Sequence, residues 1–171
     1  LQMKKITKLF TAIIAVCTLA LCIAFAGCAN DGLDLGNGTG NYIAKQTETE
    51  VVFVGTTDVL KVHDGYSLYD YMTALNKKNQ LNFEGYTGDY GYFITSVNGV
   101  EAVSGATSGT YWSVYISFKT LDGDDAVYAG GEYSTEYVYE STTLYSANYG
   151  VSGIPYVNGA TYALVLESWG A

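Results

Sequence analysis

The sequence predicts an α+β fold in which one main helix packs on a mixed or antiparallel sheet. In residues 68–79, apolar side chains recur at helical spacing. Several other segments are rich in tyrosine, valine and threonine and alternate in polarity, which is typical of strands. Because strand patterns lie on both sides of the helix along the chain, we expect the helix to cover one face of a sheet.

The helix has a well-defined expected beginning. Ser67 and Asp70 have the spacing of a capping box, in which each side chain bonds the backbone N–H of the other residue. Two lysines lie near the expected end, where positive charge suits the helix dipole. The expected apolar face consists of Leu68, Met72 and Leu75.

Strand signals flank the helix on both sides. Residues 47–54 predict a strand, and residues 58–62 predict a second one that completes a hairpin. After the helix, residues 84–92 predict a loop of glycine and tyrosine. The next expected strand, residues 92–97, ends at Asn98-Gly99, which is a strong turn signal.

Three further strands are expected in the second half of the chain. Residues 111–118 alternate cleanly, so that one face carries Trp112, Val114, Ile116 and Phe118. Residues 132–140 predict an extra strand with one tyrosine-lined face. Residues 161–169 predict the last strand, which follows a turn at Asn158-Gly159.

The N-terminal segment has the layout of a bacterial secretory signal. Three lysines precede an uncharged apolar run, residues 9–26, and the sequence Phe25-Ala26-Gly27-Cys28 resembles a lipobox. We therefore expect residues 1–27 to be a lipoprotein signal peptide and Cys28 to carry the lipid. A retained membrane-spanning helix and plain secretion are the alternatives.

The positions of the cysteines and of the glycine-rich segment agree with a lipidated cysteine followed by a tether. Only Cys28 of the three cysteines follows the apolar run, so a disulfide framework is not expected beyond it. Residues 29–41 are rich in glycine, asparagine and aspartate, and residues 28–46 as a whole predict a lipidated cysteine with a flexible tether. The domain is then expected at residues 47–171, attached to the lipid bilayer through Cys28 and facing outside the bacterial cell.

Charge and composition limit the classes of partner that the chain can bind. All 17 acidic residues follow Cys28, with five of the eight basic ones, which leaves a side-chain charge of −12. Nucleic-acid binding is excluded because phosphate contacts require basic side chains. The 17 tyrosines all lie at or beyond Tyr42 and suit both strands and binding faces.

The sequence offers no positive case for an enzyme, and no cofactor is expected. His63 is the one histidine, and no G-x-S-x-G or phosphate-binding glycine motif is present. Residues 122–125, Asp-Gly-Asp-Asp, are the best candidate for a calcium site, with a solvated turn as the alternative. No metal site is expected.

Four motifs in order resemble a known family. They are DGYSLYDYM (64–72), YGYFITSVNGV (90–100), YWSVYI (111–116) and GVSGIPYVNGATYALVLESW (150–169). This set resembles the C-terminal domain of transcobalamin and intrinsic factor, together with similar bacterial lipoprotein domains of the DUF4430 type. The resemblance implies a β-grasp-like shape and one half of a cleft around cobalamin.

The resemblance also implies a ligand site and a function. The implied ligand-binding residues are Ser96, Asn98, Gly99, Val100, Tyr111, Trp112, Tyr149 and Val151. The implied protein is a surface lipoprotein that binds cobalamin or a related corrinoid noncovalently and passes it to a membrane uptake transporter. This hypothesis requires residues 90–100 and 145–152 to share one concave face.

Two departures from the family bear on this hypothesis. The large helical domain of the vertebrate carriers has no counterpart, and residues 119–148 form a long tyrosine-rich insertion. The insertion fits either a lid over the ligand or an edge hairpin. A surface module that binds protein or glycan on the same fold is the alternative function.

Overall fold

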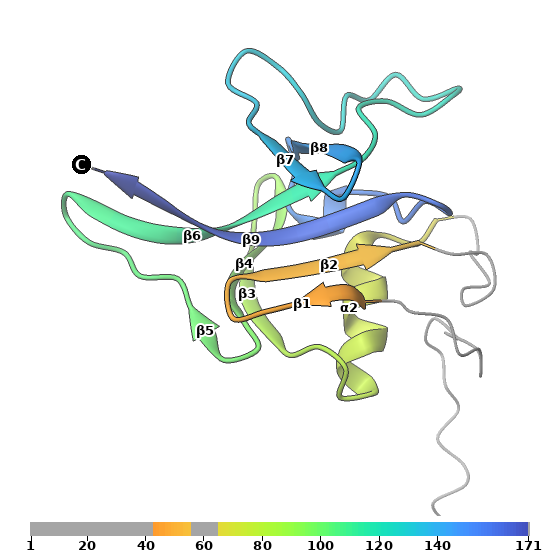
Figure 1. The fold of residues 1–171 in the computed structure, drawn as a ribbon. Coiled ribbons are helices and arrows are strands. Elements are labelled where there is room, and N and C mark those ends of the chain that lie inside the picture. Colours follow the sequence, from red (N-terminus) through yellow and green to blue (C-terminus); the bar gives the residue numbers. More distant parts are fainter. Residues whose placement is uncertain (1–42, 56–64, 171) are drawn as a thin grey trace, which may run out of the picture. The chain divides into compact units, whose positions relative to one another are not determined.

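The computed structural model describes residues 43–55 and 65–170, which belong to one compact unit of the chain. These residues form two antiparallel sheets and one α-helix, so the α+β fold class is confirmed (Figure 1). The six-stranded sheet has the order β1 (Ile43–Gln46), β2 (Glu50–Val54), β9 (Thr161–Gly170), β6 (Ser108–Ile116), β8 (Thr142–Ser146) and β7 (Glu136–Tyr139). The smaller sheet has the order β3 (Phe83–Gly88), β4 (Gly91–Val97) and β5 (Val100–Glu101).

Helix α2 (Leu68–Lys77) begins at the capping box that the sequence predicts. The Ser67 hydroxyl accepts from the Asp70 N–H at 3.3 Å, and the Asp70 carboxylate accepts from the Ser67 N–H at 2.8 Å. The expected apolar face, Leu68, Met72 and Leu75, is fully buried. The helix ends two residues before the expected position because Asn79 adopts a left-handed conformation with φ of 55°.

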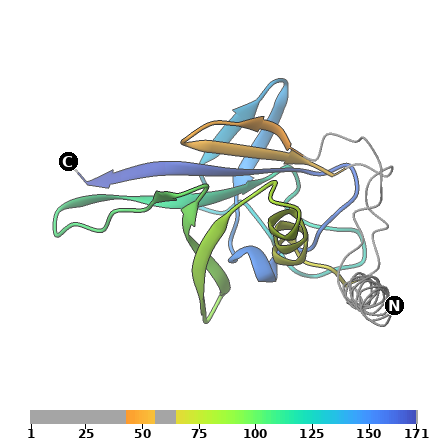
Figure 2. The ribbon, with the colours of Figure 1, turned by 90° about the horizontal axis from the view of Figure 1, so that it is seen from below.

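The core lies between the six-stranded sheet and the layer formed by α2 and the smaller sheet. Figure 2 shows both on the same side of the long ribbon that β6 and β9 form. Alternate residues of the central strand β9 point to opposite faces. Tyr162 and Leu164 enter this core, whereas Ala163 lies in a smaller cluster on the other face.

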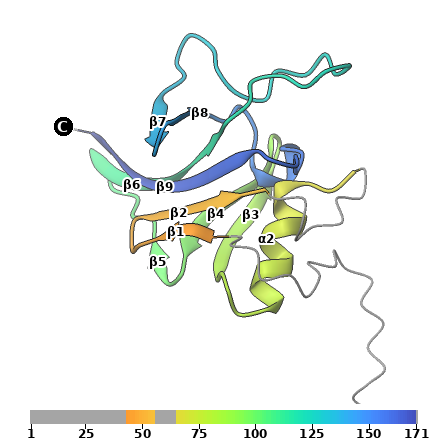
Figure 3. The same cartoon turned by 45° about the vertical axis from the view of Figure 1, so that its right-hand side comes forward.

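The smaller cluster lies under the β7–β8 hairpin and beside β2. Its buried members are Val52, Tyr115, Leu144 and Ala163. In Figure 3 the β7–β8 hairpin stands over the ribbon of β6 and β9, away from α2. Of the two interpretations of residues 119–148, the edge hairpin is the one that this part of the insertion adopts, because β8 pairs with β6 and β7 pairs with β8.

Two expectations about local structure are wrong. Residues 84–92 form most of the β3–β4 hairpin instead of a loop, because pairing with β4 overrides the low strand propensity of Gly85 and Gly88. Residues 43–46, expected in the tether, form β1 at the edge of the large sheet. The expected strand at residues 58–62 lies outside the described residues.

The remaining strands follow the sequence pattern closely. Strand β6 begins three residues before the expected position, and β9 spans the expected segment plus one residue. Within the expected strand at residues 132–140, the observed β7 is shorter and begins at Glu136. Asn98 and Gly99 have φ of 51° and 81°, as the predicted turn between β4 and β5 requires.

Candidate functional site

A groove of about 380 Å³ opens beside the edge of β6, where β4 and the segment after β8 approach it. Most of its lining is apolar or aromatic. The aromatic residues among the lining are Tyr86, Tyr92, Phe93, Tyr111, Trp112 and Tyr149. No lysine, aspartate or glutamate is among its described lining residues, so the groove suits an uncharged, partly flat ligand.

The edge of β6 supplies polar backbone groups to the groove. The Thr110 N–H donates to the Val103 carbonyl at 2.7 Å, and the Val114 carbonyl accepts from the Ala147 N–H at 2.8 Å. Because backbone direction alternates along a strand, the N–H and carbonyl of Trp112 point to the same side as these two groups. The Trp112 N–H and carbonyl therefore face the side of β6 on which the groove lies.

Two distant segments meet at one end of the groove. The Gly150 N–H donates to the Tyr90 carbonyl, and the Tyr92 N–H donates to the Ser152 hydroxyl, each at 2.8 Å. A Cβ on Gly150 would lie 2.5 Å from the Tyr92 carbonyl oxygen, so only glycine permits this approach. Of the two segments expected to share a concave face, residues 92–95 and residues 146, 147, 149 and 150 line the groove together, so the expectation is confirmed for these parts.

The structure brings three of the eight expected ligand-binding residues to the groove. Tyr111 and Trp112 line it from β6, and Tyr149 lines it from the segment after β8. Tyr111 is 44% exposed, whereas the Trp112 side chain is nearly buried and donates from Nε1 to the Val100 carbonyl at 3.0 Å.

The other five expected residues are not in the groove lining. Ser96 and Val151 are buried, and Val100 acts through its carbonyl as the partner of Trp112. Asn98 and Gly99 form the turn at the far end of β4. Residues 98–100 were expected at the site because they follow directly after the strand that approaches it. The start of β4 is the end that meets Gly150, and the strand carries residues 98–100 away from it.

Asn98 instead borders a separate pocket of about 430 Å³ lined mainly by amide side chains. Its Oδ1 accepts from the Asn82 N–H at 3.0 Å, and its own N–H donates to the Asn82 carbonyl at 2.7 Å. These bonds fix the β4–β5 turn against the start of β3. Asn98 therefore has a structural role that accounts for its presence at the turn.

Eleven of the 14 groove residues were missed by the sequence interpretation. Four of them, Tyr86, Tyr92, Phe93 and Ile94, are the large apolar or aromatic residues on β3 and β4, and the ring centroids of Tyr86 and Phe93 are 5.8 Å apart in a stacked pair. Their alternation with glycine and threonine is the signal that could have identified a hairpin with an aromatic face.

Two tyrosines of the groove, Tyr92 and Tyr111, have raised pKa values. Burial, followed by the nearby Tyr69 and Glu84, raises the pKa of Tyr92. Burial and the Glu167 carboxylate raise the pKa of Tyr111. The groove is lined by aromatic rings that can cover a flat apolar surface.

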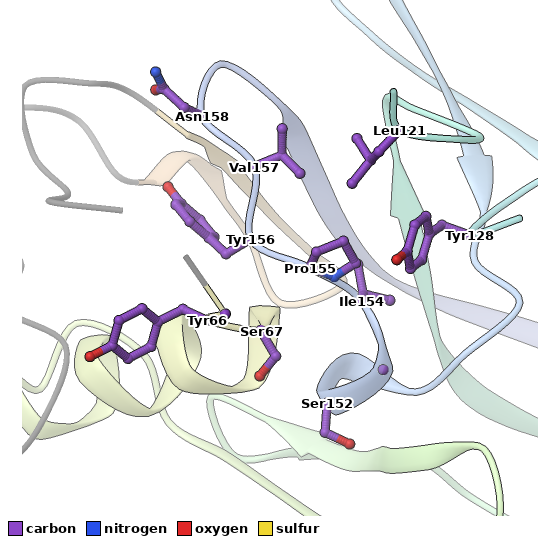
Figure 4. A pocket seen from close by; sticks show the side chains of 12 residues that line it. Tyr66, Ser67, Leu121, Tyr128, Ser152, Ile154, Pro155, Tyr156, Val157 and Asn158 are labelled. Carbon is purple, nitrogen blue, oxygen red and sulfur yellow. The ribbon is translucent and has the colours of Figure 1, made fainter. Parts of the chain in front are cut away.

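A second pocket, of about 450 Å³, lies where the loop before β9 meets the start of α2 (Figure 4). Tyr66, Tyr128 and Tyr156 contribute to its lining, and Figure 4 shows them around Pro155. The Tyr162 hydroxyl holds the loop, because it accepts from the Val157 N–H at 2.6 Å and donates to the Pro155 carbonyl at 3.0 Å. None of the eight expected ligand-binding residues lines this pocket.

The candidate calcium loop is a closed turn. Asp124 accepts from the Ala126 N–H at 2.9 Å and from the Tyr128 hydroxyl, and these bonds lower the pKa of its carboxyl, the Tyr128 bond most. In residues 43–55 and 65–170, no three side chains of histidine, cysteine, aspartate or glutamate gather as a metal site would require. Cys28 and His63 lie outside the described residues.

Within the described part of the chain, the helices lack the length and hydrophobicity needed to cross a bilayer.

Comparison with known proteins gives one match. Residues 65–117, from just before α2 to the end of β6, match the model of a family described as "Domain of unknown function (DUF4430)". No curated protein and no solved structure matches the chain. The match supports the DUF4430 part of the resemblance and includes the β4 and β6 walls of the groove, but not Tyr149.

Proposed function

We propose that this chain is a surface lipoprotein whose groove binds cobalamin or a related corrinoid noncovalently. In this proposal residues 1–27 are the signal peptide, Cys28 anchors the chain to the outer side of the cell membrane, and the domain is a β-grasp-like relative of the transcobalamin C-terminal domain. A membrane uptake transporter would receive the ligand.

One observation carries the proposal. Three segments far apart in the sequence, at Tyr92, Tyr111–Trp112 and Tyr149, line one groove. The last two are segments that the family resemblance implies in ligand binding. Aromatic walls suit the flat face of a macrocycle, and polar residues of the lining such as Ser113 and Ser146 suit the amide groups on its rim.

The size of the groove limits the expected affinity. A groove of about 380 Å³ encloses only part of a corrinoid, so much of the ligand surface would stay in water. We therefore expect a dissociation constant on the order of micromolar, weaker than a two-domain clamp would give. Such an affinity suits transfer to a second protein better than storage.

Titration of the purified full-length chain with cobalamin and with cobinamide, followed by calorimetry, tests the proposal. Tyr149→Ala and Tyr92→Ala should each weaken binding about tenfold, because each removes an aromatic wall. Tyr133→Ala is the matched control, since Tyr133 is 90% exposed and lies outside the groove. Absence of binding at high micromolar ligand would reject the corrinoid.

Lipid attachment is tested separately in cells. Growth with a labelled fatty acid should mark the wild-type chain and leave Cys28→Ser unmarked, because the thiol is the attachment point. A labelled Cys28→Ser chain would contradict the assignment of Cys28. This test is independent of what the groove binds.

A further inference from the structure

The face of the β6–β9 ribbon that points away from α2 carries a second group of exposed aromatic side chains. Trp169 is 41% exposed and Tyr111 is 44% exposed. Trp169 pairs across the ribbon with Gly109, and Glu167 pairs with Tyr111. We call these four residues the ribbon platform. The two strands that carry it run side by side in Figures 1 to 3.

Gly109 lets the Trp169 indole lie against the neighbouring strand. A Cβ on Gly109 would lie 2.3 Å from the Val103 carbonyl oxygen and 2.7 Å from Trp169 Nε1, so neither the backbone nor the ring leaves room for a side chain there. The ring therefore rests on the glycine backbone and keeps its remaining surface toward solvent. A ring held in this way presents a flat surface at little entropic cost on binding.

Glu167 is a carboxylate that already binds hydroxyl groups. It accepts from the Ser113 hydroxyl and from the Tyr115 hydroxyl, each at 2.5 Å. The Tyr115 hydroxyl is further bonded to Thr135 at 2.8 Å. After burial, the interaction with Glu167 is the next cause that raises the pKa of Tyr111. A carboxylate has about four acceptor positions, so the half-buried Glu167 keeps acceptor capacity beside the two rings in addition to its two bonded hydroxyl donors.

We propose that the ribbon platform binds a neutral polysaccharide chain. A sugar ring has an apolar C–H face that packs on an aromatic ring, and hydroxyl groups at its rim that need acceptors such as Glu167. Trp169 and Tyr111 are diagonal neighbours on adjacent strands, roughly 7–8 Å apart. This separation allows one chain to contact both rings.

The negative charge of the platform and of the whole protein favours a neutral polysaccharide over an anionic one. The platform contains an acid and no base, and the whole sequence carries 17 acidic against 8 basic residues. An anionic polysaccharide would be repelled by Glu167 and by this excess. A cationic ligand would be attracted to both, so it is the competing occupant that the experiment must separate.

The platform is distinct from the groove. Gly109, Glu167 and Trp169 do not line the groove, whereas Tyr111 touches both sites. Trp169 and Gly109 are therefore the positions to change. Because these two residues do not line the groove, we expect their variants to lose polysaccharide binding and to bind corrinoid as the wild type does. The two proposals can therefore fail independently.

The test uses the full-length chain in a detergent without sugar groups. Hexasaccharides of β-1,4-linked glucose, xylose, mannose and N-acetylglucosamine are titrated, with tryptophan fluorescence and calorimetry as readouts. At least one should bind, and Trp169→Ala should weaken it about tenfold or more. Gly109→Ala should also weaken binding while keeping the indole, because the added methyl would meet both the Val103 carbonyl oxygen and the ring, and both must shift. Tyr133→Ala is the control and should bind as the wild type does.

The outcomes decide clearly. Binding lost in both variants, with circular dichroism spectra like the wild type, supports the proposal. Failure of all four hexasaccharides at millimolar concentration overturns it, and so does equal binding by wild type and Trp169→Ala. Choline or polylysine binding that depends on Trp169, with no saccharide binding, also overturns it in favour of a cationic ligand. If Trp169→Ala does not fold, Trp169→Phe decides, because it keeps a smaller ring at this position and should bind the saccharide more weakly than the wild type.

Discussion

The two faces of the six-stranded sheet are built in different ways. Among the described residues, the face toward α2 belongs to a cluster of 19 buried apolar residues, whereas the outer face has a cluster of four. On the outer face, hydroxyl groups gather around Glu167 within a few residues of that small cluster. We infer that the inner face supplies most of the stability, which leaves the outer face free to carry polar and exposed groups.

The largest expected difference comes from one substitution on each face. Leu164 and Leu144 are both fully buried, the first in the inner cluster and the second in the outer one. Leu164→Ala should cost about 4 kcal/mol of unfolding free energy, and Leu144→Ala about 2 kcal/mol, because the smaller cluster relaxes more easily. Urea unfolding measures both, and equal losses would contradict the division between the faces.

A smaller effect is expected where the groove is joined to the inner face. Gly150→Ala forces a methyl group against the Tyr92 backbone and should cost about 1–3 kcal/mol. The same change should separate β4 from η1 (Val151–Gly153) and weaken binding in the groove. Gly88→Ala is the matched control for the loss of stability, since its methyl would meet only the rings of Phe93 and Tyr86, which can move. Similar losses in both variants would show that the backbone contact is unimportant.

The outer face should respond to alkaline pH through Tyr115. Burial first, and then the bond to Glu167, raises the pKa of Tyr115 to about 12 from an ordinary value of 10. Its contribution to stability is therefore complete below pH 10 and is lost as the pH rises from 10 to 12. Tyr115→Phe should cost about 1 kcal/mol at neutral pH and should make the alkaline decline shallower.

Unfolding by urea at pH 8, 10, 11 and 12 measures this decline. Tyr128, whose pKa is also raised to about 12 because it bonds to Asp124, stays in both proteins, so the decline should diminish without vanishing. An identical pH profile for wild type and Tyr115→Phe would mean that the Glu167 network does not couple to folding.

The smallest effect is expected at the rim of the outer face. Lys45 pairs with Glu50 and contacts the Tyr137 hydroxyl at 3.5 Å, which brings the edge strands β1 and β7 together. The Lys45 side chain is 39% exposed, and exposed ion pairs contribute little to stability. Lys45→Met should leave the urea midpoint unchanged within error, and a clear shift would reveal that the two edges support each other.

Local patterns were enough to predict much of the fold. Ser67 and Asp70 marked the helix start, and the alternation of residues 111–118 identified β6 and its buried face. The β3–β4 hairpin could not be predicted in this way because Gly85 and Gly88 have low strand propensity, and pairing with β4 decides their state. The edge strand β1 was assigned to the tether because only its pairing with β2, which local sequence does not show, makes it a strand.

The site was predicted less completely than the fold. Tyr111, Trp112 and Tyr149 were assigned to it from motif position and do line the groove. Val151 was assigned with them, but one turn of η1 directs it into the core, where it is fully buried. Motif position shows which segments approach one another, whereas the direction of each side chain depends on tertiary packing.

The position of β9 has a consequence for how the domain is made. Val51 on β2 pairs with Leu164 on β9, and β9 lies between β2 and β6. The centre of the large sheet therefore stays open until residues 161–170 leave the ribosome. Contacts this distant in sequence form slowly, so a nascent chain remains unfolded while it is synthesised. Delayed folding of this kind is compatible with the export that we propose for the chain, because an exported polypeptide crosses the membrane unfolded.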